Sequence, residues 1–192
     1  MQKISFEEAN KIAQRSIQES WDIMINLLKE RHLEKYAIRL QQPPKSVWKS
    51  FRAINNAGVY RSTGRHPKQN FTTDWKWDDS IELNLDFLTS DDAEIFVWET
   101  PKHELGHCIN YRLNYRVGHD KSFKAIMEAI GGDPNTCHNL ALTDKQKAKL
   151  HQIVCECGEE FMVSNTIFSR AKKGKYVCNK CGKNLKYGKF TL

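Results

Sequence analysis

The sequence predicts an α+β protein in which a small antiparallel sheet packs on helices and a cysteine-rich module follows. Three observations support this prediction. Apolar residues recur at helical spacing in residues 5–40, apolar and polar residues alternate within residues 47–88, and four of the six cysteines lie between positions 155 and 181. The 192 residues suit one modest domain with an appendage, and we place the boundary near residue 150.

Residues 5–40 are predicted to form one helix. Ser5 and Glu8 have the spacing of a capping box, and the apolar stripe from Ile12 to Leu33 marks the face that packs on the core. The tandem prolines of "QQPPK" end this element, because proline cannot continue a helix. We therefore assign this helix to core packing and look for chemistry further along the chain.

The sheet is predicted within residues 47–88. The segment "VWKSFRAI" is typical of a strand, and "NNAG" after it is typical of a turn. Further on, Ile81, Leu83 and Leu85 share one face of a strand while the residues between them are polar. This alternation indicates a sheet with one buried face.

A helix at about residues 91–113 contains the segment "HELGH". Pro101 either kinks this helix or begins a fresh one, and the sequence does not decide between the two. His103 and His107 are four residues apart, so one helical turn places both imidazoles on the same face, where they can bind one metal ion. Glu104 is then the candidate general base of an HExxH site.

Catalytic zinc takes three protein ligands and keeps a fourth position open. His119 is the first candidate for the third ligand, because Gly118 lets the chain turn sharply just before it. The alternative is Glu128 on the following helix. The metzincin spacing is excluded, because it needs a glycine and a histidine where this chain has Asn110 and Leu113.

The module at residues 151–192 contains two short sulfur-bearing turns. Four thiolates suit a closed, structural zinc site, and such a short module depends on the metal for its folding energy. The candidate ligands are Cys155, Cys157, Cys178 and Cys181. A variant in which His151 replaces one cysteine stays open. Cys108 is interpreted as a small packing residue.

The net charge of +7 is concentrated at the C-terminal end. Residues 170–192 hold eight Lys or Arg and no acid, whereas residues 1–169 hold 22 basic and 23 acidic side chains. A local basic field suits a polyanion such as nucleic acid, and the alternative is a solvated surface that only maintains solubility. No base-reading pattern is visible, so we expect sequence-independent contacts. The candidate contacts are Arg170, Lys172, Lys173, Lys175, Lys180, Lys183, Lys186 and Tyr187.

The segments "HELGHCI" and "GHDKSF" resemble the SprT-like zinc metalloproteases, which are related to the eukaryotic enzyme Spartan. That family shows HExxH, a downstream Gly-His and an aromatic residue soon after, here Gly118, His119 and Phe123. The segments "WKSFRAINNAGVY", "SIELNLDFL" and "VCECG…YVCNKCG" resemble further family segments, so the likeness covers about residues 40–190. The long C-terminal tail of the eukaryotic relatives has no counterpart here, and we expect a bacterial or phage type.

The resemblance implies a zincin-like metalloprotease domain over residues 1–150 and a basic zinc ribbon over residues 151–192. It implies two zinc ions, one catalytic and one structural, and cleavage of proteins that are bound or crosslinked to single-stranded or distorted DNA. Two other hypotheses stay open. One is a catalytically silent, zinc-containing DNA-binding adaptor, and the other is a general metallopeptidase without DNA dependence.

Two observations bear on the cellular location. No apolar run reaches the roughly 20 residues that a membrane span needs. The segment "MQKISFEEANKIAQ" lacks the apolar region of a secretory signal. We therefore expect an intracellular protein without a membrane partner, in the cytoplasm, at the nucleoid or in a phage-infected cell.

Overall fold

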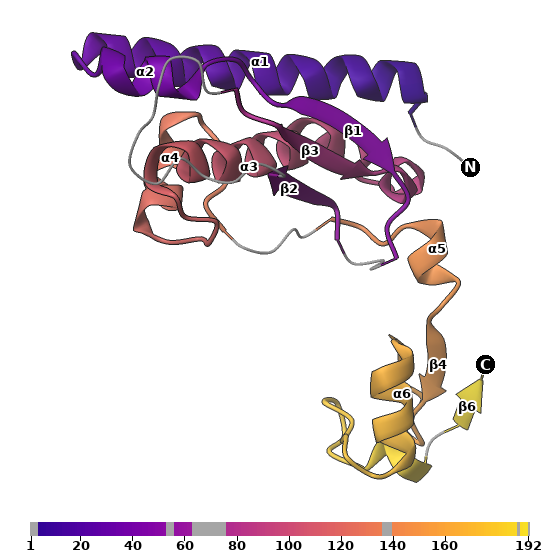
Figure 1. Cartoon of the computed structure of the whole chain (residues 1–192). Coiled ribbons are helices and arrows are strands. Elements are labelled where there is room, and N and C mark those ends of the chain that lie inside the picture. The colour runs from indigo at the N-terminus through magenta and orange to yellow at the C-terminus, as the bar shows by residue number, and fades with distance from the viewer. Residues whose placement is uncertain (1–3, 53–55, 63–75, 136–139, 188, 192) are drawn as a thin grey trace. The chain divides into compact units, whose positions relative to one another are not determined.

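The computed structural model describes residues 4–52, 56–62, 76–135, 140–187 and 189–191, and the side chains only as far as residue 186. The chain forms two compact units, Met1–Thr143 and Asp144–Leu192, which we describe separately (Figure 1). Helices and small sheets occur together, which confirms the predicted α+β class. In the part of the chain that is described, no helix combines the length and apolarity that a bilayer span requires.

Two helices replace the single helix predicted over residues 5–40. The first, α1 (Phe6–Glu30), begins at Ser5, whose side chain accepts a hydrogen bond from the Glu8 backbone N–H at 3.2 Å. After α1, His32 has a left-handed backbone with φ of 55°, which a right-handed helix cannot include. The second helix, α2 (Glu34–Leu40), starts after this break. The prediction of one continuous helix is therefore wrong at positions 31–33.

The sheet of the first unit has the strand order β1 (Lys45–Lys49), β3 (Asp79–Asn84), β2 (Gly58–Ser62). β2 is antiparallel to β3, but β1 is parallel to β3, so the prediction of an antiparallel sheet is wrong for this pair. The reason lies in the strand order. The chain reverses direction twice between β1 and β3, and β3 then pairs beside β1 as well as β2. Alternating hydrophobicity predicts strands and faces but not this order.

The third strand ends earlier than the alternation predicts. Its last residue, Asn84, is fully buried, and its side-chain oxygen accepts the backbone N–H of Asp86 at 3.1 Å. This local bond competes with the strand pattern and begins a 3-10 helix, η1 (Leu85–Thr89). Leu85 therefore belongs to η1 and not to β3.

The central helix of the first unit is α3 (Ala93–Asn114). Pro101 lies inside this helix and is buried, so of the two alternatives the helix that continues through Pro101 is the one observed. α3 packs against α1, α2, α4 (Lys121–Ala129), β2 and β3 (Figure 1). This central position buries most of the helix on all sides and brings its side chains to the sheet and to the neighbouring helices.

Arg112 joins α3 to three other parts of the first unit. Its guanidinium makes a bidentate ion pair with Asp79 at the start of β3, with Nε–Oδ2 and Nη2–Oδ1 distances of 3.0 and 2.6 Å. Its Nη1 donates to the backbone carbonyls of Leu40 and Gln42, which lie at and just beyond the end of α2. Both charged side chains are only 1% exposed. The pair therefore fixes the sheet and α2 to α3 from inside.

We expect Arg112→Met to lower the free energy of unfolding by about 3–5 kcal/mol, because it leaves the buried carboxylate of Asp79 without a counter-ion. Urea denaturation of the full chain measures this change. Arg61→Met is the matched control, since Arg61 is 58% exposed and pairs with Glu82 at the surface; its loss should stay within about 1 kcal/mol. Equal losses in the two variants would contradict the structural role of the buried pair.

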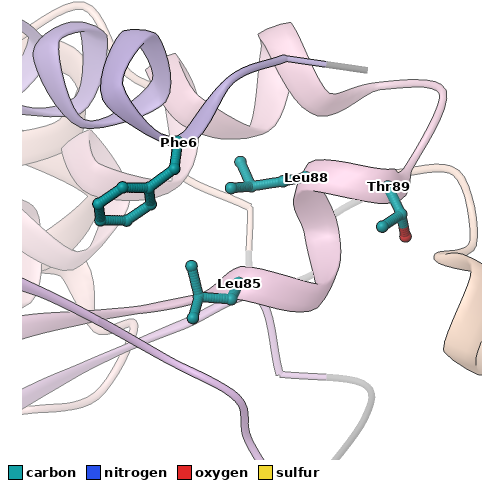
Figure 2. Close-up of a pocket in the computed structure, with 4 residues that line it drawn as sticks. All are labelled: Phe6, Leu85, Leu88 and Thr89. Carbon is teal, nitrogen blue, oxygen red and sulfur yellow. The ribbon is translucent and has the colours of Figure 1, made fainter. Parts of the chain in front are cut away.

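A surface pocket of about 420 Å³ lies where the start of α1 meets η1 (Figure 2). Its described walls are formed by Phe6, Leu85, Leu88 and Thr89. Phe6 is 49% exposed, and its ring meets Trp48 edge to face at 5.8 Å. These four residues carry no titratable group, so they offer the pocket no acid–base or metal chemistry.

The second unit contains a small antiparallel sheet in the order β5 (Glu160–Val163), β4 (His151–Val154), β6 (Lys189–Thr191). The remaining elements are α5 (Asp144–Lys147), α6 (Asn165–Lys172) and η2 (Leu185–Tyr187). Its small core consists of Ile153, Cys155, Phe168, Ala171, Cys178 and Leu185. Because two of these six residues are cysteines, the sulfur site is part of the core.

Candidate metal centres

Three imidazoles meet on one side of α3. His103 and His107 come from consecutive turns of α3, and His119 comes from the turn that precedes α4. Their donor nitrogens all lie within 4.8 Å of one another, and His103 Nε2 is 3.0 Å from His119 Nε2. Tetrahedral zinc with Zn–N bonds of 2.0–2.1 Å places its nitrogens about 3.3 Å apart. One ion therefore fits among the three predicted histidines, which we call the histidine cluster.

The turn between α3 and α4 brings His119 back to α3. Tyr115 ends α3 with a left-handed φ of 63°, and its N–H bonds to the Tyr111 carbonyl. Asp120 then begins α4, because its Oδ1 accepts the Phe123 N–H at 3.0 Å. Gly118 does not adopt a left-handed φ. The sharp turn predicted at Gly118 is therefore made at Tyr115.

The ring of Phe123 packs against all three imidazoles. Its ring is fully buried, with centroid distances of 5.1, 4.5 and 4.7 Å to the rings of His103, His107 and His119. Glu128, the alternative third ligand, is exposed on α4 and is not part of the histidine cluster. Helix α4 therefore contributes an aromatic support and not a carboxylate.

The protonation state of the histidine cluster suits a metal. Burial and the neighbouring His119 lower the pKa of His107 to about 4, although the Val117 backbone weakly opposes this shift. Burial and Lys124 lower the pKa of His119 as well. His107 Nδ1 is buried and has no well-aligned hydrogen-bond partner among the described residues. Neutral imidazoles are the form that binds zinc, so these residues fit that ion.

Glu104 lies in a slot formed by β2. Its Oε2 accepts the backbone N–H of Tyr60 at 2.7 Å, and the side chain is buried. A Cβ on Gly58 would lie 2.9 Å from Glu104 Cγ and 2.8 Å from Thr100 Cγ2, so only glycine leaves room here. Burial raises the pKa of Glu104 to about 7, and the Tyr60 N–H opposes that rise. The carboxylate is thus held in place and is able to exchange a proton near neutral pH.

Gly58 and Tyr60 were not predicted to be parts of this site. Gly58 was predicted to lie in a turn, whereas the structure places it at the first position of β2. An isolated glycine at the start of a strand often marks a close approach of another group to the backbone. That signal was present, but it does not name Glu104 as the approaching group.

One of three comparisons with known proteins found a match. The family model described as the SprT-like family matches residues 22–154. The chain belongs to the SprT-like family. The match confirms the predicted resemblance and indicates a metallopeptidase-like domain that includes α3 and His119. No curated protein and no solved structure matches the chain.

The burial of Glu104 predicts how the stability of the metal-free SprT-like protein depends on pH. Its pKa is raised from 4.5 to about 7, so folding favours the protonated form and loses stability as pH rises through this range. We expect metal-free Glu104→Gln to be more stable than the metal-free parent by about 2–3 kcal/mol at pH 8 and by much less at pH 4. Urea denaturation at both pH values measures the difference.

The control for this pH effect is Glu82→Gln, since Glu82 pairs with Lys49 and Arg61 at the surface. Those hydrogen bonds and charges outweigh its partial burial and lower the pKa of Glu82. This variant should lose stability at pH 8 and not gain it. A Glu104→Gln difference that is the same at pH 4 and pH 8 would contradict the buried-charge explanation.

The second unit of the SprT-like protein holds four sulfurs around one point. The Sγ atoms of Cys155 and Cys181 are 3.6 Å apart, and those of Cys157 and Cys178 are 3.8 Å apart. Disulfide sulfurs lie about 2.0 Å apart, whereas tetrahedral zinc with Zn–S bonds of 2.3 Å separates its sulfurs by about 3.8 Å. These four residues, which we call the cysteine cluster, therefore have the spacing of ligands to one ion.

Backbone hydrogen bonds shape the two turns that carry the cysteine cluster. Gly158 and Gly182 have φ of 87° and 70°, and their N–H groups bond to the carbonyls of Cys155 and Cys178. Burial raises the pKa of Cys178, but the backbone N–H groups of Cys181 and Lys180 outweigh it and lower that pKa to about 7. His151 stacks on Phe168 at 4.3 Å and lies outside the cluster. The variant with His151 as a ligand is therefore wrong.

The predicted nucleic-acid contacts with described side chains fall into two groups. Lys180 and Lys183 lie in the second cysteine turn, at residues 178–183, and they pair with Glu159 and Glu156 of the first cysteine turn, at residues 155–159. Tyr187 has no described side chain. The other predicted residues lie at or near the C-terminal end of α6 and are exposed: Arg170, Lys172, Lys173, Lys175 and Lys186. The predicted basic tail is thus not one uniform surface.

Proposed function

We propose that this SprT-like protein is a zinc-dependent endopeptidase with a zincin-like site, and that it cleaves proteins bound or crosslinked to DNA. One observation carries the proposal. Three imidazoles converge on one side of α3, and the residue after the first of them is a buried glutamate whose carboxylate the Tyr60 N–H holds in place, within a family whose domain is metallopeptidase-like. A purely structural metal site has no use for such a carboxylate.

When bound, zinc would supply Lewis acidity to the attacking water and to the scissile carbonyl. The three neutral nitrogens of the histidine cluster would hold the ion. Glu104 accepts the proton of the attacking water at Oε1, because Oε2 is occupied by the Tyr60 N–H. Glu104 then passes this proton to the amine nitrogen of the leaving chain. A pKa of about 7 suits a group that must take and return a proton.

The strand β2 is the best candidate to align an extended substrate. It is an edge strand in the order β1-β3-β2, and the Tyr60 N–H bonds to Glu104 instead of to β3. The outer edge of β2 therefore runs beside the proposed base. An extended peptide that adds to this edge through backbone hydrogen bonds would bring its scissile bond to Glu104.

The charge distribution supports attachment to DNA. Residues 144–192 hold eleven Lys or Arg and four Asp or Glu, whereas residues 1–143 hold nineteen of each. The first unit is thus electrically balanced, and the second unit carries the net charge of +7. A basic unit tethered to a protease raises the concentration of substrates that sit on a polyanion.

The experiment compares cleavage of a DNA-binding protein by the zinc-loaded chain with and without single-stranded DNA. We expect cleavage at least about tenfold faster with DNA, and loss of cleavage when a chelator removes zinc. Equal rates would favour a general metallopeptidase. Absence of cleavage under both conditions would favour a silent DNA-binding adaptor.

Gly58→Ala tests the slot that holds Glu104. The added Cβ would meet Glu104 Cγ at 2.9 Å, so we expect the carboxylate to move and kcat to fall by about 10- to 100-fold while zinc content and KM change little. Gly118→Ala is the matched control, because nothing lies within 4 Å of a Cβ there. An unchanged kcat in Gly58→Ala would show that the slot does not position the base.

A further inference from the structure

The two lysines of the second cysteine turn form ion pairs with glutamates of the first cysteine turn. Lys180 Nζ lies 2.7 Å from Glu159 Oε2, and Lys183 Nζ lies 2.9 Å from Glu156 Oε2. Both glutamates belong to the first cysteine turn, so each ion pair runs from one turn to the other. The pairs therefore tie the two turns together and offset the charges of Lys180 and Lys183.

The end of α6 has a different charge environment. Arg170, Lys172, Lys173 and Lys175 fall within six residues, and Gly174 turns the chain among them with φ of 73°. Among the described residues, Arg170, Lys173 and Lys175 make no ion pair. From position 161 to the end of the sequence there is no Asp or Glu. Three of the four cations at this end of α6 therefore lie outside the ion pairs of the described residues.

Lys186 joins the same group from a distant position in the sequence. Asn184 Nδ2 donates to the Gly174 carbonyl at 2.9 Å, and a Cβ on Gly174 would lie 3.6 Å from Lys186 Cδ. This contact brings the segment before η2 against the turn after α6. Five exposed cations thus gather around one helix end, where the negative end of the helix dipole also favours positive side chains.

We infer that the backbone of DNA binds to a group of five cations at the end of α6, and that Lys180 and Lys183 instead hold the two cysteine turns together. We call this group the α6 surface, and it consists of Arg170, Lys172, Lys173, Lys175 and Lys186. This inference rests on the DNA attachment in the proposed function, and it divides the predicted contacts by role. Phosphates are the fitting partner, because closely spaced and exposed cations neutralise consecutive phosphates and release counterions.

The test measures binding of the zinc-loaded full chain to a fluorescent oligothymidylate over a range of salt concentrations. One triple variant is Arg170→Gln, Lys173→Gln and Lys175→Gln. The other, Lys149→Gln, Lys180→Gln and Lys183→Gln, removes the same number of charges from elsewhere in the unit. Zinc content and circular dichroism confirm that both variants are folded.

We expect the α6 variant to reduce the slope of log K against log salt by about 2, since each lost phosphate contact on a single strand contributes about 0.7, and to bind at least about tenfold more weakly at low salt. The matched variant should keep most of the slope and instead lose zinc faster to a chelator. Equal slope losses, or a slope unchanged in the α6 variant, would overturn the inference.

The DNA-binding assay gives a different result if the proposed function is wrong than if only the α6 surface is wrongly assigned. If the parent chain does not bind DNA at any salt concentration, the α6 inference and the DNA attachment both fail, and proteolysis without DNA shows whether the peptidase remains. If the parent binds DNA but neither salt slope differs, only the assignment of the α6 surface is wrong.

Discussion

Replacing Glu104 with Gln is expected to lower proteolysis by about 10²- to 10⁴-fold while the zinc content of the chain stays the same. Glutamine has nearly the same shape, and its side-chain oxygen can still accept the Tyr60 N–H that Glu104 binds at 2.7 Å. The three imidazoles are untouched, so the variant loses only the group that accepts a proton. Initial rates on an unfolded protein substrate and elemental analysis measure the two quantities.

The matched control is Glu128→Gln, which removes an exposed carboxylate on α4 outside the histidine cluster. It should keep both activity and zinc. Cleavage by Glu104→Gln at the parental rate would show that Glu104 is not the base. Loss of zinc from Glu128→Gln would restore that residue as the third ligand in solution.

Cys178→Ser is expected to have the largest effect on folding. Cys178 is almost fully buried and packs in the small core of the second unit, which also contains Ile153 and Leu185. Structural zinc supplies about 10–16 kcal/mol of apparent binding energy in small zinc modules, and that energy is coupled to folding. We expect zinc to fall from two ions to one per chain, and residues 144–192 to become sensitive to limited proteolysis.

Cys108→Ala is the control for this prediction. Cys108 is fully buried in the first unit and belongs to neither metal cluster. This variant should keep two zinc ions and a protected second unit, although the small cavity lowers the stability of the first unit. Retention of two ions by Cys178→Ser would contradict the assignment of the cysteine cluster as a zinc site.

The features that depend on neighbours along the chain could be predicted from the residues alone. The four-residue spacing of His103 and His107 places both on one face of α3, because the helical period is the same wherever the helix lies. The short spacings in the cysteine turns and the concentration of lysines after position 170 are local features of the same kind. The strand β3 was predictable from its period of two, but β2 and the parallel pairing of β1 with β3 were not.

Which distant groups meet depends on the packing of the folded chain. Packing brings His119 to the helix histidines and leaves Glu128 exposed, and it places Gly58 and the Tyr60 N–H against Glu104. It also pairs two of the predicted DNA-binding lysines with glutamates. One cause is common to these cases. Tyr60 and Glu104 are 44 positions apart, and their contact depends on how β2 packs against α3, which no local periodicity encodes.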